Sequence, residues 1–273
     1  MQIPFSASKQ GSGDLKSQTN MKALILEDGV RTTIAREGQR ILHSVIHTLG
    51  PNVRMPARLR PGQMPSSDDA WHRLVTQVCV MGWSGGMGTI ADNGPMRDDF
   101  RAATSLHAWR RHHYDKAYMA GVLESYRATR FPKKAADTLG KMAETPTIVH
   151  MGEVVLLNGL SAKMARDELR DTLIERCRFF RMKSASDFMI STGLSDDVIA
   201  LDVRIVGVLY KYLGYERTAA QVQSSRKDYL SLETALRVVC QEAEISLAKF
   251  DRILFQFSAM SALEYVLRHA KAD

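Results

Sequence analysis

The stretch that decides the fold is CRFFRMKSASDFMISTGLSDDVIALDVRIVGVLYKYLG, residues 177–214. Its pattern predicts the end of one helix, a tight connection over residues 178–182, a short helix that starts at Lys183, a capped turn, and a new helix after Asp202. A lysine therefore opens one helix, and an aspartate opens the next helix 19 positions further along the chain.

The sequence on either side of this stretch is also helical in pattern. No segment shows the period-two alternation of a half-buried strand, so we expect an all-α fold. A first helix is expected over residues 32–49, stopped by Gly50-Pro51, and a second begins at a cap on Asp68 or Asp69. Further helices are expected near residues 98–112, 115–129, 132–143, 147–157, 161–177, 183–192, 203–213, 231–242 and 247–270.

Composition places the chain among ordinary globular proteins of one large core or two small ones. Residues 1–20 carry few apolar side chains and are expected to form a flexible tail, which leaves residues 21–273 as the folded domain. No apolar run approaches the roughly 20 residues of a membrane span, and the N-terminus does not read as a signal peptide, so we expect a cytoplasmic protein without a membrane.

The three cysteines are too few for a four-cysteine iron-sulfur cluster, and none forms a CxxC pair. We therefore predict that Cys79, Cys177 and Cys240 are buried and reduced, and that the protein needs no metal and no cofactor. The net charge of +7 is in the direction that a polyanionic partner favours, because neutralised phosphates release condensed counterions.

Residues 163–192 and the segment that follows them resemble the helix-hairpin-helix of the endonuclease III superfamily of DNA glycosylases. In that family a lysine opens the second hairpin helix, and an aspartate opens the next helix about eighteen or nineteen positions on, within an apolar-Asp-apolar-His/Arg pattern. Lys183 and the sequence Leu201-Asp202-Val203-Arg204 match it. The resemblance implies two helical subdomains with the active-site cleft between them, and catalytic roles for Lys183 and Asp202.

Elementary chemistry agrees with those roles. A lysine attacks a sugar carbon only as the neutral amine, which the first turn of a helix favours because the helix dipole there opposes an ammonium. Desolvation by Phe180, Met182 and Phe188 acts in the same direction. An aspartate at a helix N-terminus stays ionised, and can either stabilise positive charge on the sugar or accept the proton of the lysine.

The hairpin departs from the family at the two places that usually carry glycine. The family sequence Leu-Pro-Gly-x-Gly lets backbone amides approach a DNA phosphate, whereas this chain has Phe179 and Arg181 there. We expect direct charge pairing by Arg178 or Arg181 to replace the amide contact, with Arg204 as a third DNA-binding side chain.

A weaker resemblance concerns the base pocket. Asp251 and Phe255 look like the Asp-x-x-x-Trp element of archaeal 8-oxoguanine glycosylases, where the acid and the aromatic ring contact the extruded base. Spacing by one helical turn places both side chains on one face of a helix. Gln77 and Trp83, beside a glycine-rich loop, are further candidates for base binding.

The resemblance implies a DNA glycosylase with lyase activity that excises a damaged base, with 8-oxoguanine as the first candidate, through a Schiff base on Lys183. Its partner is double-stranded DNA with a flipped nucleotide, and we expect a monomer. Two alternatives stay open: a helix-hairpin-helix protein that binds DNA without catalysis, and a glycosylase-like enzyme that acts on a free nucleoside or nucleotide.

Overall fold

A computed structural model describes residues 24–28, 31–55, 64–80, 85–90, 94–257 and 261–270. The predicted tail over residues 1–20 lies outside these ranges. Within them almost all of the regular secondary structure is helical, which confirms the predicted all-α class, and the strands form only two short antiparallel hairpins.

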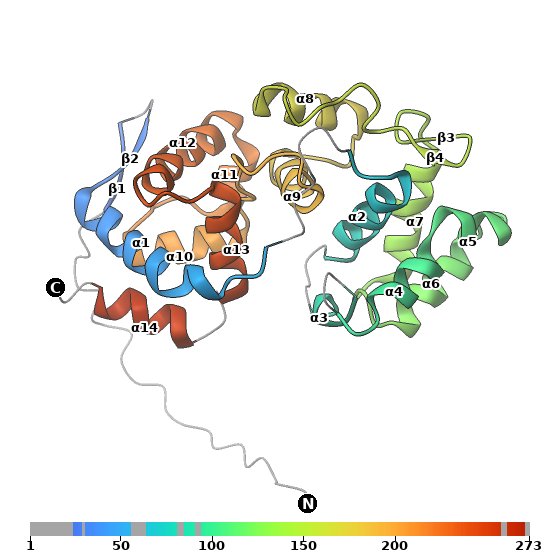
Figure 1. The fold of residues 1–273 in the computed structure, drawn as a ribbon, viewed down its shortest axis with the longest axis horizontal. Helices are drawn as coiled ribbons and strands as arrows, with labels where there is room; N and C mark the ends of the chain where they lie inside the picture. Colours follow the sequence, from blue (N-terminus) through green and yellow to red (C-terminus); the bar gives the residue numbers. More distant parts are fainter. Residues whose placement is uncertain are drawn as a thin grey trace, which may run out of the picture.

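Two hydrophobic cores divide the molecule into two helical subdomains (Figure 1). We call the first the central subdomain, because it is built from the middle of the chain. Its elements are α2 (Ser67–Cys79), α3 (Met87–Ile90), α4 (Arg97–Thr104), α5 (Leu106–Arg111), α6 (Lys116–Ser125), α7 (Pro132–Ala143), β3 (Val149–His150), β4 (Glu153–Val154), α8 (Arg166–Arg176) and α9 (Met182–Thr192).

The second core lies in the terminal subdomain, which combines both ends of the chain. Its elements are β1 (Ile25–Glu27), β2 (Thr32–Ile34), α1 (Arg36–Leu49), the short 3-10 helix η1 (Gly50–Asn52), α10 (Val203–Leu213), α11 (Ala219–Ser224), α12 (Arg226–Glu242), α13 (Leu247–Phe257) and α14 (Ser261–His269). The chain thus enters the terminal subdomain, crosses to the central one, and returns after α9.

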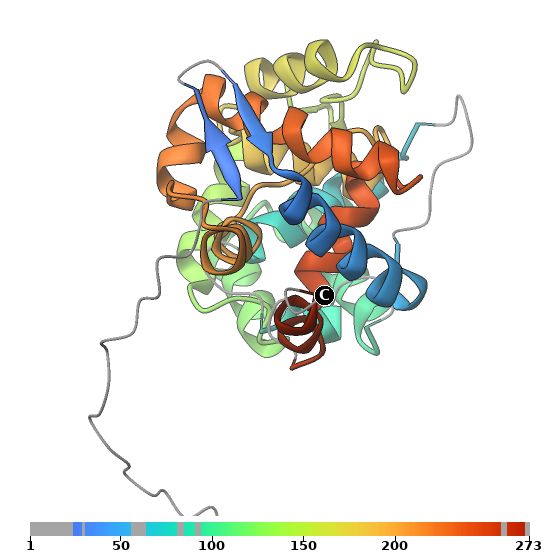
Figure 2. The same ribbon diagram turned by 90° about the vertical axis from the view of Figure 1, so that its left-hand side faces the viewer.

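The first predicted helix begins four residues later than expected, because residues 32–34 pair with β1. The register places Ile25 opposite Ile34, and both side chains are buried. The N–H of Thr32 donates to Ser231 Oγ of α12 at 2.7 Å, which holds the hairpin against that helix (Figure 2). A buried aliphatic pair and this hydrogen bond outweigh the helical pattern of the sequence.

Several other predicted helices differ from the structure: α8 begins at Arg166 and not at residue 161, and α12 begins at Arg226 and not at residue 231. Residues 147–157 form the β3–β4 hairpin, because Met151 and Gly152 both take positive φ, which makes a tight strand turn. The helix expected over residues 98–112 is divided at Ser105, which caps α5, and the one over 247–270 is divided into α13 and α14. The cap of α2 is Ser66, not Asp68 or Asp69.

Candidate active site

The helix-hairpin-helix is present as α8, a short turn and α9. The turn is closed by the N–H of Phe180, which donates to the carbonyl of Cys177 at 2.7 Å. The buried rings of Phe180 and Phe188 lie 5.2 Å apart and fix the second helix beneath the turn. Because α9 begins at Met182, Lys183 stands in its first turn, as the sequence predicted.

The side chain of Lys183 is partly buried, with 29% of its surface exposed. Its Nζ lies 3.7 Å from Oδ2 of Asp187, one helical turn further along α9. Asp187 in turn accepts a 2.7 Å hydrogen bond from Nη2 of Arg252 on α13. The ion pair between Asp187 and Arg252 therefore joins the two subdomains beside the predicted nucleophile.

Asp202 is the N-cap of α10. Its Oδ1 accepts hydrogen bonds from the backbone N–H groups of Arg204 at 2.9 Å and Ile205 at 3.0 Å. Two orphan amides of the helix are satisfied in this way. The predicted position of this aspartate at a helix start is confirmed.

The segment before Asp202, residues 199–201, is buried, and side chains from other helices satisfy its backbone. Asp251 Oδ2 accepts from the N–H of Ala200 at 2.7 Å, and Glu233 Oε1 accepts from that of Ile199 at 3.2 Å. The hydroxyl of Tyr229 accepts from Leu201 at 3.2 Å and donates to the carbonyl of Ile199 at 2.6 Å. These bonds leave Asp202 little freedom to move relative to the helices of the terminal subdomain.

Glu233 also forms a buried ion pair across the two subdomains. Nη2 of Arg170 on α8 lies 3.0 Å from Oε1 and 2.8 Å from Oε2 of Glu233 on α12, and both side chains are 1% exposed. Burial raises the pKa of the Glu233 carboxyl, while the charge of Arg170 opposes that rise. The pair fixes the hairpin relative to the segment that carries Asp202.

A cleft of about 530 Å³ lies between the two subdomains and within the range typical of ligand pockets. Lys183 and Asp202 both line it, as do three predicted base-binding residues, Gln77, Asp251 and Phe255. Sequence reasoning missed further lining side chains that share a polar or charged head: Asn52, Arg54, Arg73, Asp187, Arg252 and Gln256. The lysine-aspartate spacing of one helical turn could have indicated Asp187.

The predicted base-binding side chains differ in what they offer a ligand. Phe255 is half-buried, with the guanidinium carbon of Arg204 4.4 Å from its ring centre and that of Arg252 at 5.7 Å. Gln77 donates from Nε2 to the carbonyl of Ser184 at 3.0 Å, and its buried Oε1 has no hydrogen-bond partner among the described residues.

Asp251 is only 1% exposed, and its Oδ2 holds the backbone of Ala200. Burial raises the pKa of its carboxyl to about 6, although Arg252 lies 3.6 Å away. Trp83, the fourth predicted base-binding residue, lies outside the described residues. The role of each of these side chains in base binding stays a prediction.

The three predicted DNA-binding arginines are placed differently. Arg178 and Arg181 are exposed on the hairpin turn, and neither forms an ion pair with any residue that the structure describes. Arg178 lies 5.4 Å from the ring centre of Phe179. Arg204 stacks on Phe255 beside the cleft, so its predicted contact with DNA would come from the cleft side of the molecule.

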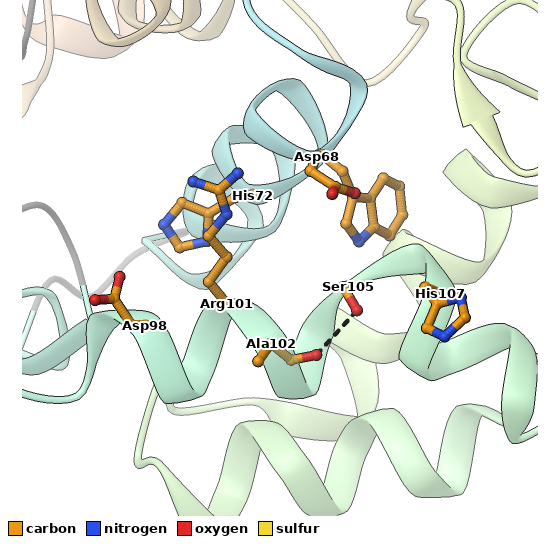
Figure 3. A pocket seen from close by; sticks show the side chains of 8 residues that line it. Asp68, His72, Asp98, Arg101, Ala102, Ser105 and His107 are labelled. Carbon is orange, nitrogen blue, oxygen red and sulfur yellow. Dashed lines mark hydrogen bonds between the residues drawn. The ribbon is translucent and has the colours of Figure 1, made fainter.

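A second pocket of about 510 Å³ opens on α2, α4 and α5 of the central subdomain (Figure 3). Asp68, His72 and Arg101 line it, and Ser105 donates to the carbonyl of Ala102 at its edge. None of the residues predicted to act in catalysis or DNA binding lines this pocket. The chemistry we expect therefore belongs to the cleft between the subdomains.

The cysteines are all buried and unpaired, as predicted. In the described part of the chain, no group of three or more His, Cys, Asp and Glu side chains is arranged to hold a metal ion. A search of the same residues for a helix long and apolar enough to cross a membrane finds none.

These features define an all-α helix-hairpin-helix protein with a charged cleft between two subdomains. Three solved structures share the fold. The 8-oxoguanine DNA glycosylase of Thermotoga maritima superposes with a TM-score of 0.53 at 20% identity, covering 82% of this chain and 88% of that protein.

The other two structures are of the 8-oxoguanine DNA glycosylase of Methanocaldococcus jannaschii. One covers 82% of this chain and 86% of that protein. The other, a complex of the glycosylase/lyase with a 15mer DNA containing 8-oxoguanine, covers 72% and 83%. Both have a TM-score of 0.54 at 18% identity.

The sequence also matches a family model. Residues 99–245, more than half of the chain, match the model of the 8-oxoguanine DNA glycosylase family, and the chain belongs to that family. A comparison with curated proteins finds no match. The matched residues run from α4 to the loop after α12 and include Lys183, Asp187 and Asp202, whereas Gln77, Asp251 and Phe255 lie outside them.

Proposed function

We propose that this protein is a DNA glycosylase with β-lyase activity, which uses Lys183 as the nucleophile and Asp202 as its carboxylate partner. The observation that carries the proposal is that Lys183, in the first turn of α9, and Asp202, the N-cap of α10, line the same cleft. In such a site the target nucleotide is flipped out of the duplex, and the amine displaces the base from the sugar.

Each residue of the pair has a physical role in this reaction. Lys183 would form a bond to C1′ and then a Schiff base with the opened sugar. The carboxylate of Asp202 would stabilise the positive charge that develops on the sugar as the base leaves. Its two amide hydrogen bonds use Oδ1, so the second carboxylate oxygen is not engaged by them.

The substrate we propose is 8-oxoguanine in double-stranded DNA, and Gln77 supports this choice. Oxidation of guanine at C8 converts N7 from an acceptor into an N–H donor. The buried Oε1 of Gln77 has no hydrogen-bond partner in the part of the chain that the structure describes, and an unsatisfied buried oxygen costs about 1–3 kcal/mol, so a donor on the ligand is favoured there. Replacing Gln77 with Ala should reduce the preference for 8-oxoguanine over guanine by roughly 10-fold.

Borohydride trapping tests the proposal directly. Wild-type protein mixed with a duplex containing 8-oxoguanine should give a covalent adduct, because borohydride reduces the Schiff base to a stable amine. Lys183→Gln should abolish the adduct and leave DNA affinity within a few fold. Lys141→Gln, at an exposed position of α7 that does not line the cleft, is the matched control and should trap like wild type.

The same experiment separates the two alternatives. Duplex binding without any adduct would favour a DNA-binding protein that lacks catalysis. Release of base from free nucleosides, without duplex binding, would favour an enzyme of nucleoside metabolism. An adduct that persists in Lys183→Gln would move the nucleophile to another lysine.

A further inference from the structure

Asp187 is the carboxylate that lies within ion-pair distance of Lys183. Its Oδ2 is 3.7 Å from Nζ of Lys183, and its Oδ1 is held at 2.7 Å by Nη2 of Arg252. The side chains of Asp187 and Arg252 are 19% and 13% exposed, so both are largely shielded from solvent. One oxygen of the carboxylate is thus fixed by an arginine, and the other faces the amine.

Asp202 does not occupy this position. Its Oδ1 accepts two amides of α10, and it forms no ion pair with Lys183 within 4 Å. The contacts therefore place Asp187, and not Asp202, beside the amine. Asp187 and Asp202 thus both line the cleft, with different partners.

The charges around Asp187 keep it ionised. Burial favours its neutral form, but the charges of Arg252, Lys183 and Arg73 outweigh burial and lower the pKa of the carboxyl. Arg252 also lies beside Asp251. Burial raises the pKa of the Asp251 carboxyl to about 6, and the negative charge of Asp202 acts in the same direction. Near neutral pH, Asp187 is therefore a carboxylate able to accept a proton from the amine beside it.

We propose that Asp187 is the proton acceptor for Lys183, and that Arg252 is a positioning residue that holds Asp187 against the amine. This assignment rests on the proposed function. The proton passes from Nζ to Oδ2, and the freed electron pair on nitrogen forms the bond to C1′. The bond between C1′ and the nitrogen of the base breaks, and its electron pair leaves with the base. The base then takes a proton from solvent, and Asp187 releases the proton of Lys183 to solvent.

A test compares the pH dependence of base release by wild type and Asp187→Asn, in single turnovers on a duplex containing 8-oxoguanine. Between pH 7 and 9 Asp251 is mostly ionised, so its titration contributes little to the profile. The wild-type rate should be nearly flat, because the acceptor is on the protein. In Asp187→Asn the amine of Lys183 must lose its proton to solvent, so the rate of base release should rise by about tenfold per pH unit.

Two further proteins separate proton transfer from packing. Asp187→Ala removes the carboxylate and leaves space beside Lys183. Added formate should then raise its rate several-fold, while chloride at equal ionic strength should not. Asp171→Asn is the matched control, because Asp171 pairs with Arg226 at 2.6 and 2.8 Å on the exposed surface of α8, and it should keep the wild-type profile.

Thermal melting and duplex affinity are measured on the same proteins to show that each is folded and binds DNA. A flat profile for Asp187→Asn, parallel to that of wild type, overturns the assignment of Asp187 and leaves the proposed glycosylase intact. The absence of any formate rescue in a folded, DNA-binding Asp187→Ala also overturns it. Wild-type protein that forms no borohydride adduct overturns both the assignment and the proposed function.

Discussion

Asp251→Asn should change how stability depends on pH, because Asp251 titrates differently in the folded and unfolded chain. Burial raises the pKa of its carboxyl from 3.8 to about 6. The folded state therefore favours the protonated acid. The stabilisation from this group is fully present below pH 3.8 and is lost as the pH rises through 6.

The size of the expected stability difference follows from the change in the pKa of Asp251. About two pKa units correspond to roughly 3 kcal/mol of unfolding free energy. Asparagine is neutral at every pH and can still accept the hydrogen bond from the N–H of Ala200. Relative to wild type, the Asn variant should thus gain about 3 kcal/mol between pH 4 and pH 8, which corresponds to roughly 6–12 °C in melting temperature.

The assay records the thermal melting of both proteins by circular dichroism at several pH values from 4 to 8. Only the difference between the two curves matters, because other groups titrate alike in both proteins. A difference that does not change with pH would refute the reasoning. It would mean that Asp251 is ionised throughout, stabilised by Arg252 more strongly than burial destabilises it.

Two other predictions concern the hairpin and the helix that follows it. Asp202→Asn should slow base release by about 10²- to 10⁴-fold, the range for a positioned acid-base group, with little loss of stability because asparagine also caps helices. Asp202→Ala should in addition lose about 1 kcal/mol, seen by denaturant unfolding, and an active Asn variant would reduce Asp202 to a plain cap. Replacing Arg178 and Arg181 with Ala should weaken binding to all duplexes equally, and lower the slope of log affinity against log salt by about 0.9 per lost phosphate contact. An unchanged salt slope, measured by fluorescence anisotropy, would place the DNA-facing surface elsewhere.

Local sequence was sufficient for the features that depend on neighbouring residues. The apolar periodicity of residues 183–192 and 203–213 sets two helices, because each buries one face whatever lies opposite. Asp202 follows from the same pattern, since a helix start is fixed by the residue that caps it. The buried cysteines follow from the absence of any metal-ligand or disulfide spacing.

Other features depend on residues far apart in the chain, and no local pattern predicts them. The β1–β2 hairpin replaces a predicted helical turn because Ser231, 199 positions away, holds Thr32. Oδ2 of Asp251 accepts a hydrogen bond from the N–H of Ala200 in the segment before Asp202, a contact across 51 positions. The packing of distant helices decides such contacts, because the intrinsic helix and strand propensities of the residues are too small to outweigh it.

The sequence by itself determined the all-α class, the helix-hairpin-helix, and the two residues that open successive helices. Only the tertiary structure decided that an arginine of the other subdomain holds the carboxylate beside the lysine. Asp187 and Arg252 are 65 positions apart, on different subdomains, and they meet because two separate cores pack against each other. The charges around a buried group come from every helix packed against it, and they come together only when the chain has folded.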